Sequence, residues 1–444
     1  MKLTDEEKRM LAGDHGPVIA QAMDYLVQFG DAFGAERFVD VIYAHYPAEM
    51  SIYRGNVEDA VEYAATGARV CIPTTSSTLG CDLDQWECLG CPQKLADLQA
   101  QVVEAHRRMG VLGTYTCTPQ WLGFVPPKGS LIIAVESSAI IYFNSVLGAR
   151  TNRGGVFTRY SAVTGKYPLM GYLLDENRRG THLFQLQLGP DDLRHESDYS
   201  ALGFHVGNLV GSEVPVFDRL PPSTSTQLLA LGAALATSGS VTLFHAPGCT
   251  AEADTVEQAF AGTTPKETYV VTRDDLQAAY DKLTTVPPGS PVDFVTLGCP
   301  HYTLEQLRFV ADWLTEHRRD FVRRPREADA TSAAASPHPA TRVVHPDARL
   351  WVCTNRMTKQ AARWEGIVDR IEGAGGRVVC DSCPVESHMR ISTCKEHGLK
   401  TPQIEAMVTD SCKMARYVGD LIGCQTALRN REECLESAVT GRLA

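Results

Sequence analysis

The sequence predicts an α/β protein with mostly parallel sheets. From about residue 225 onward, short apolar segments typical of strands alternate with longer amphipathic segments typical of helices, which is the pattern of parallel α/β layers. The chain has 444 residues, enough for two or three domains. Hydrophobic residues make up 44% and charged residues 21%, as in globular proteins with large cores. This composition excludes a disordered chain, a coiled coil and a collagen-like rod.

The N-terminal part begins with a helix signal. Thr4 is a predicted N-cap with Glu7 as its capping-box partner, and Gly13 is the predicted stop after Ala12. Apolar periodicity then predicts further elements up to residue 147. The predicted helices cover 17–29, 59–66, 94–109 and 139–147, and the predicted strands cover 38–43, 68–72 and 130–136.

The second half alternates regularly between the two types of element. Its predicted strands cover 241–244, 268–271, 292–297, 349–353 and 377–379, and its predicted helices cover 227–237, 274–283, 304–317 and 358–372, with a further one from 254. Residues 323–347 are rich in Ala, Ser, Pro, Thr and Arg and have no period, so we interpret 329–346 as a surface linker. The predicted organisation is an N-terminal α/β region with substrate-binding loops (1–225), an α/β domain (226–325), a linker or flexible insertion (326–347) and a C-terminal α/β domain (348–444).

Charge and hydropathy limit the classes of binding partner and the cellular compartment that we expect. The net charge is −11, from 42 basic and 53 acidic residues, which argues against nucleic acid as a partner because phosphate contacts need clustered Lys and Arg. The apolar runs are shorter than the roughly 18 residues of a membrane span, and the N-terminus is too charged for a signal peptide. We therefore expect no membrane association and a cytoplasmic location.

The chain has 14 cysteines, and metal binding is one explanation. Cys88 with Cys91 and Cys380 with Cys383 form two C-x-x-C pairs. A zinc site would require both pairs to converge, although they are far apart in the sequence. A non-catalytic, zinc-binding structural subunit is therefore one hypothesis.

A different set of cysteines follows the predicted strands. Cys299, Cys353 and Cys383 lie at strand ends, and Cys117 lies in a Thr-Cys-Thr-Pro segment. Open α/β sheets hold ligands at the carboxyl ends of their strands, and thiolates are the ligands of iron–sulfur centres. The alternative is that these cysteines are buried packing residues.

Polar side chains gather in three further segments. Residues 136–153 combine carboxylate, hydroxyl, amide and guanidinium groups around a predicted strand and helix, and could bind a small carboxylate through Arg150. Ser411 could act as a base only if nearby cations or a metal lowered its pKa strongly, which Lys413 alone would not do. The alternative is a helix cap. Thr74 and Thr75 follow another predicted strand and could equally form a turn.

Together these segments resemble the catalytic large subunit of the aconitase X family. The most specific match is the block Asn144–Asn152, Asn-Ser-Val-Leu-Gly-Ala-Arg-Thr-Asn. Cys81, Cys88 and Cys91 are not part of the resemblance. The other matching segments are 11–16, 44–45, 73–75, 116–119, 136–139, 297–301, 381–383 and 409–413.

The resemblance implies an aconitase-superfamily fold of three α/β/α domains and a hydro-lyase. It implies an iron–sulfur cluster (2Fe-2S or 4Fe-4S) or a mononuclear iron. It also implies a small swivelling-domain subunit, which we expect to be a separate chain. The expected reaction removes water from a small hydroxy acid, cis-3-hydroxy-L-proline, to give Δ1-pyrroline-2-carboxylate. The alternative substrate is mevalonate 5-phosphate.

The resemblance also assigns roles to residues. It places the metal on Cys117, Cys299 and Cys383, with Cys353 in reserve. By analogy with aconitase, Ser411 is the expected base, with Lys413 and Arg150 holding it deprotonated. The expected substrate-binding residues are Thr74, Thr75, Glu136, Ser137, Asn144, Ser145, Thr151, Asn152, His301 and Asn355.

Overall fold

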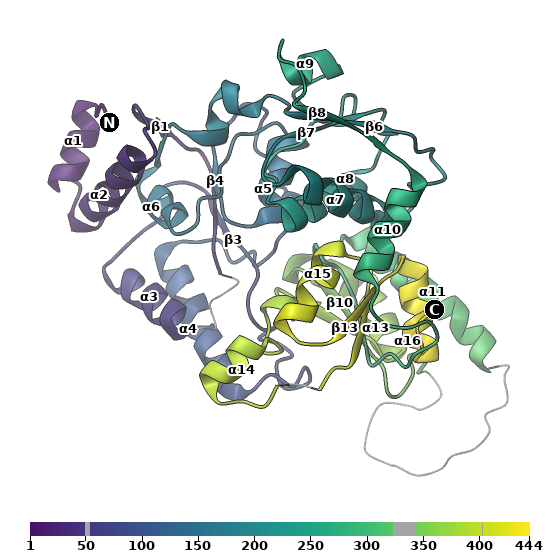
Figure 1. Cartoon of the computed structure of the whole chain (residues 1–444). Coiled ribbons are helices and arrows are strands. Elements are labelled where there is room, and N and C mark those ends of the chain that lie inside the picture. Colours follow the sequence, from purple (N-terminus) through teal and green to yellow (C-terminus); the bar gives the residue numbers. More distant parts are fainter. Residues whose placement is uncertain (49–53, 323–341, 402) are drawn as a thin grey trace.

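The computed structural model describes residues 1–48, 54–322, 342–401 and 403–444. Most of the predicted linker therefore lies outside the described residues. The purple-to-blue N-terminal part, the teal middle part and the green-to-yellow C-terminal part lie side by side (Figure 1). Each contains a parallel sheet with helices packed against it, so the predicted mixed α/β fold with mostly parallel sheets is confirmed.

The N-terminal part contains a three-stranded parallel sheet in the order β3-β2-β4. A short antiparallel pair, β1 with β5, lies beside it. The predicted capping box at Thr4 forms, and Gly13 ends the first helix with φ 95°. The strands are β1 Phe38–Asp40, β2 Ala44–Tyr46, β3 Thr74–Ser76, β4 Ile133–Ala134 and β5 Lys166–Pro168, and the helices are α1 Asp5–Ala12, α2 Pro17–Ala32, α3 Arg54–Ala65, α4 Gln93–Met109, α5 Ser137–Ser145 and α6 Phe157–Thr164.

The middle part contains a second parallel sheet in the order β7-β6-β8. Helices α7 and α8 pack closely against each other and carry much of the apolar core of this part. The strands are β6 His182–Leu186, β7 Pro215–Asp218 and β8 Glu267–Val271, and the helices are α7 Glu196–Val210, α8 Ser225–Gly239, α9 Val256–Phe260 and α10 Arg273–Leu283.

The C-terminal part contains a five-stranded, all-parallel sheet in the order β11-β10-β9-β12-β13. Its direction of winding reverses between β9 and β12, which makes this position a topological switch point. The strands are β9 Phe294–Leu297, β10 Arg349–Thr354, β11 Arg377–Cys380, β12 Ala406–Thr409 and β13 Gln425–Leu428, and the helices are α11 Leu304–Val322, α12 Arg356–Trp364, α13 Ile367–Gly373, α14 Ile391–His397, α15 Cys412–Leu421 and α16 Arg431–Thr440. Short 3-10 helices cover Pro119–Leu122, Gly171–Leu173, Asp175–Arg178 and Pro384–Glu386.

Three predicted elements differ from the structure. The predicted strand 68–72 is a loop, since the N–H groups of Val70 and Cys71 donate to Met109 and Ala162, and the strand begins only after Pro73. The predicted strand 241–244 is not a strand, and only the following residue, His245, forms an isolated bridge with Val216. The predicted helix 358–372 is two helices, which separate at Gly366 with φ 68°.

Among the helices of the described residues, none combines the length and the apolar character that a membrane-spanning helix needs.

Candidate active site

The site lies at the switch point of the five-stranded sheet. Cys299 follows β9 and Ser411 follows β12, and these two strands are hydrogen-bonded neighbours. The carboxyl ends of parallel strands meet at one edge of a sheet, and the gap where the winding reverses holds ligands in such folds. The sheet topology therefore brings together two residues that lie far apart in the sequence.

Four cysteine thiols share this region. Burial raises the pKa of the Cys117, Cys353 and Cys383 thiols, and the neighbouring Cys299 sulfur raises each of them further. The backbone N–H of His301 donates to the Cys117 sulfur at 3.2 Å. Cys299 and Cys383 are only partly buried. Several thiols thus face one another where ionisation is unfavourable without a nearby cation.

Two helix N-termini meet beside these thiols. The Lys413 ammonium, in the first turn of α15, lies 2.6 Å from the carboxylate of Glu136, which caps α5. The hydroxyls of Ser137 and Ser138 lie 3.3 Å from the same ammonium. Burial alone would raise the pKa of Glu136, but Lys413 outweighs it and holds the pKa at about 2. Glu136 is therefore a carboxylate, and Lys413 is held charged.

Ser411 lies between the cysteines and Lys413. Its Oγ accepts the backbone N–H of Met414 at 3.3 Å and caps α15. The same hydroxyl hydrogen-bonds the Cys299 sulfur, and Lys413 also acts on that sulfur electrostatically. Ser411 is thus both a helix cap and a neighbour of a predicted metal ligand.

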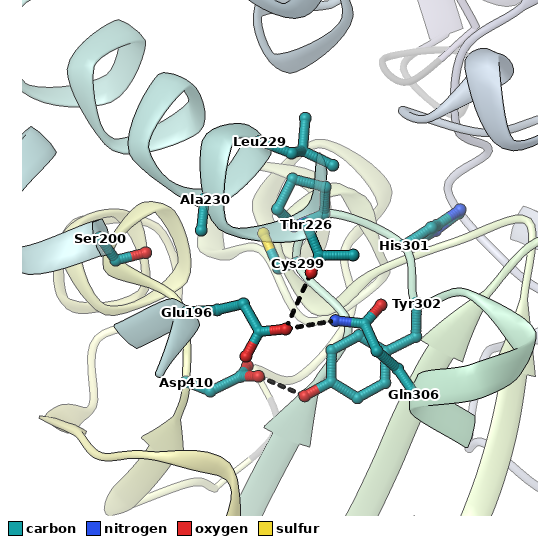
Figure 2. A pocket seen from close by; sticks show the side chains of 11 residues that line it. Glu196, Ser200, Thr226, Leu229, Ala230, Cys299, His301, Tyr302, Gln306 and Asp410 are labelled. Carbon is teal, nitrogen blue, oxygen red and sulfur yellow. Dashed lines mark hydrogen bonds between the residues drawn. The ribbon is translucent and has the colours of Figure 1, made fainter. Parts of the chain in front are cut away.

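A buried polar network lies behind Cys299. Burial raises the pKa of Asp410 to about 6, and the Tyr302 hydroxyl donates to its carboxylate. Arg431 donates to the Tyr302 oxygen at 2.9 Å and pairs with Glu196 at 3.0 Å. Figure 2 shows Glu196, Asp410 and Tyr302 around a cavity of about 30 Å³, which is the space of about one water molecule and too small for a substrate. None of the four side chains of this network was predicted from the sequence to be a site residue.

Histidines support the loops around the site. His301 bonds Thr116 Oγ1 through Nδ1 at 3.0 Å and the carbonyl of Ser382 through Nε2 at 3.3 Å, so it joins the loops that carry Cys117 and Cys383. His45 Nδ1 bonds Thr75 Oγ1 at 2.8 Å. Burial lowers the pKa of both histidines to about 4, so both are neutral at pH 7.

The amide and hydroxyl groups of the 144–152 block are engaged by the protein itself. Asn144 donates to the carbonyls of Thr151 and Thr242 and accepts from the Thr151 N–H, all at 3.0 Å. Ser145 Oγ accepts the N–H of Phe244 at 2.9 Å. These bonds occupy backbone groups that a strand ladder at 241–244 would need. The Thr151 and Asn152 side chains likewise bond backbone carbonyls at 2.9 Å.

The two arginines near this block differ in their partners. Arg150 pairs with Asp175 at 2.5 Å and donates to the carbonyl of Leu173. Burial lowers the pKa of the Arg153 guanidinium, the charge of Glu136 partly offsets this, and Tyr417 and Tyr172 also lie near it. Within the part of the chain that the structure describes, Arg153 has no salt bridge.

Two further predicted residues lie at the edges of the site. Asn355 caps α12 by accepting the N–H of Thr358 at 2.8 Å, while its buried Nδ2 has no partner among the described residues. Thr74 Oγ1 donates to the carbonyl of Ile72 at 2.9 Å.

Other cysteines have different neighbours. Cys380 lies with Asp82 and Asp84 in a group whose possible ligand atoms are all within 4.8 Å of one another. Lys359 and Arg356 already pair with these two carboxylates, at 3.5 and 3.0 Å. The C-x-x-C pairs thus have separate surroundings, with Cys380 beside Asp82, Cys383 beside Cys299, and Cys91 beside Cys81.

Comparisons with known proteins give one consistent family. Models of the aconitase X first, second and third domains match residues 1–176, 180–281 and 326–440. A phosphomevalonate dehydratase large subunit from Methanothermobacter thermautotrophicus is 36% identical, over 94% of this chain and 94% of that protein. A cis-3-hydroxy-L-proline dehydratase from Pseudomonas aeruginosa is 31% identical, over 98% of this chain and 70% of that protein.

A solved structure agrees in fold. The crystal structure of Thermococcus kodakaraensis aconitase X in its holo form matches with a TM-score of 0.81 and 30% identity, over 99% of this chain and 100% of that one. The resemblance predicted from the sequence motifs is thereby confirmed, and the chain belongs to the aconitase X family.

Proposed function

We propose that this chain is the large subunit of a metal-dependent dehydratase that removes water from a small hydroxy acid. The observation that carries the proposal is the arrangement at the switch point. There the predicted ligands Cys117, Cys299 and Cys383 lie beside Ser411 and the ion pair of Lys413 with Glu136. The relatives are named dehydratases, which supports the same reaction class.

The thiols suit an iron centre. Their ionisation is unfavourable in this site unless a cation offsets the charge, and thiolates from three loops are suitable ligands for iron or an iron–sulfur cluster. The N–H bond to the Cys117 sulfur is a contact that stabilises a thiolate. When bound, the centre would supply Lewis acidity at the leaving hydroxyl. Cys353, which is fully buried in β10, remains the reserve ligand.

The protein's own residues would handle the proton. We assign to Ser411 the removal of the proton next to the substrate carboxylate, because its hydroxyl faces the same sulfur that Lys413 acts on. Lys413 and Glu136 hold each other charged and fix the start of α15 against α5. Arg150 already pairs with Asp175. We therefore assign the positive charge beside Ser411 to Lys413 alone, whereas the resemblance implied both Lys413 and Arg150.

We assign the substrate carboxylate to Arg153. Its guanidinium is free of salt bridges within the described residues and lies near Glu136, and a guanidinium binds a carboxylate in a two-pronged manner. Arg153→Ala should raise KM at least tenfold, whereas Arg150→Ala should leave KM within a factor of about two. The steady-state rates of both variants test this, and an equal effect of the two would contradict the assignment.

Two substrates are candidates. We place cis-3-hydroxy-L-proline first, since its carboxylate is its only anionic group and matches one unpaired guanidinium. Mevalonate 5-phosphate is the second candidate, because the relatives with that activity match this chain over nearly their whole length. Their names describe large subunits, so we propose a separate small subunit as partner.

Turnover of both substrates by the two-subunit enzyme tests the proposal. The large chain is purified without oxygen together with its small subunit and assayed with each compound. Dehydration of either one supports the reaction class, and the faster substrate identifies the specificity. No dehydration of either compound by enzyme that contains its metal would contradict the proposed substrates.

A further inference from the structure

A second cysteine cluster lies outside the active site. Residues 81–91, just before α4, contain Cys81, Cys88 and Cys91. The Cys81 and Cys91 side chains are buried, with 3% and 4% exposure, and their thiols hydrogen-bond each other. None of the three is among the groups that shift the pKa of the predicted iron ligands. The proposed dehydration therefore assigns them no role.

A histidine from the far end of the chain completes this cluster. The side chain of His388 hydrogen-bonds the Cys91 thiol and is 94% buried, since its exposure is 6%. Its Nδ1 has no hydrogen-bond partner among the residues that the structure describes. Two thiols and one imidazole thus lie together in a buried position.

The surroundings of these groups are mostly apolar, and the Cys91 thiol also donates to the carbonyl of Pro92 at 3.8 Å. Cys81 and Cys91 belong to a small apolar cluster with Leu95, Ala96 and Leu399, and α14 lies beside α4 there (Figure 1). Besides Cys91, the charge that acts on Cys81 is that of Asp82. The Asp82 carboxylate accepts the N–H of Cys380 at 3.0 Å and pairs with Lys359. Buried thiols and an imidazole are the donor types that bind Zn²⁺ in proteins.

We propose that Cys81, Cys88, Cys91 and His388 bind one structural Zn²⁺. Three thiolates and one imidazole are a common closed tetrahedral set for this ion, and the Cys88-x-x-Cys91 spacing is typical of it. Cys88 is exposed on the turn that carries Cys91, and it supplies the fourth ligand by turning its side chain toward Cys91.

The ion would join two distant parts of the chain. It would connect the segment before α4 to residue 388, which follows the 3-10 helix Pro384–Glu386 directly after the predicted iron ligand Cys383. The bridge would thus hold one loop of the active site against the N-terminal part. The proposal does not depend on the reaction or on the substrate.

Metal titration of the full chain tests the proposal. The parent protein for this titration is Cys299→Ser, in which the predicted iron site is weakened. The parent and two double variants, which add Cys91→Ser or His388→Ala, are treated with a chelator and titrated with Co²⁺ and then with Zn²⁺. The matched control adds Cys424→Ser, at a buried cysteine elsewhere. We expect the parent and the control to bind about one equivalent of Co²⁺, to show thiolate charge-transfer absorption, and to release Co²⁺ when Zn²⁺ is added. The Cys91→Ser and His388→Ala double variants should bind the metal at least tenfold more weakly.

The wild-type chain gives a readout that does not depend on the folding of variants. Bound Zn²⁺ should protect Cys81, Cys88 and Cys91 together from alkylation, as peptide mapping can show, while the exposed Cys71 stays reactive. Equal alkylation with and without Zn²⁺, or unchanged affinity in the Cys91 and His388 variants, would overturn the proposal. A Cys81–Cys91 disulfide in protein that binds no metal would also overturn it.

Discussion

At residue 298 the backbone leaves β9 with φ 90° and passes directly beside β10. A Cβ atom at this position would lie 2.1 Å from the carbonyl oxygen of Cys353. Backbone cannot give way as a flexible side chain can, so only glycine fits. The position of the Cys299 thiol therefore depends on this residue.

Gly298→Ala should destabilise the chain by about 2–4 kcal/mol, from overpacking and a left-handed backbone together, and should abolish most activity. Gly13→Ala is the control, because its φ is 95° and its Cβ would meet nothing within 4 Å. It should cost only about 1–2 kcal/mol. Urea unfolding measures both, and equal losses would show that the contact with Cys353 is unimportant.

The motif residues could be predicted from the sequence, but their contacts could not. Glu136, Ser411 and Lys413 lie together in one cluster. Asn144 instead holds backbone groups of a distant segment, and Arg150 pairs with Asp175. Whether a conspicuous polar side chain faces a ligand or supports the backbone depends on long-range packing, which local sequence does not encode.

At the scale of elements, the first turns of α5 and α15 face each other through Glu136 and Lys413. Removing one partner leaves an uncompensated buried charge, whereas removing both leaves none. The pair therefore fixes the relative position of two helices from different parts of the chain.

A double-mutant cycle measures this coupling. Lys413→Met should destabilise the chain by about 3–5 kcal/mol, and Glu136→Gln with Lys413→Met should be less destabilised than Lys413→Met alone. The two single variants, Lys413→Met and Glu136→Gln, and the double variant should all lose activity. Additive losses in urea unfolding would mean that the two charges do not interact.

Glu196 joins α7 to three other helices. It pairs with Arg431 of α16 at 3.0 Å and accepts from Thr226 and Gln306 of α8 and α11. Burial alone would raise its pKa, but these partners hold the pKa below its usual 4.5. A carboxyl group whose pKa is lower in the folded state stabilises that state at pH values above the unfolded-state pKa. This stabilisation is lost as the pH falls below that value.

The free energy of unfolding of the wild type should therefore fall as the pH drops below about 4.5. Glu196→Gln should be less stable at pH 7 and should show a smaller decrease on acidification. The exposed Glu176→Gln serves as a control with wild-type behaviour. Parallel curves for Glu196→Gln and the wild type would contradict the ion-pair explanation.

The elements themselves were predictable where their signals were local. The capping box at Thr4 and the stop at Gly13 appear as expected. The break at Gly366 and the loop at 68–72 were missed, because a φ of 68° and bonds to distant carbonyls depend on the surrounding structure.

At the scale of the whole molecule, strand order positions the chemistry. The alternation of strands and helices predicted parallel sheets, and parallel sheets predicted that the cysteines after β9 and β11 share one edge. The sequence did not show that β12 lies beside β9, since pairing of strands about a hundred residues apart is a tertiary property. That pairing places Ser411 next to Cys299.

The central claim is that Cys117, Cys299 and Cys383 hold an iron centre on which the dehydration depends. The most direct test measures iron and acid-labile sulfide per chain, together with turnover, in anaerobically purified complexes of the wild type, Cys299→Ser and the control Cys424→Ser. We predict about one or more irons per chain and turnover in the wild type and the control, and loss of both in Cys299→Ser. Full iron and full turnover in Cys299→Ser would contradict the claim.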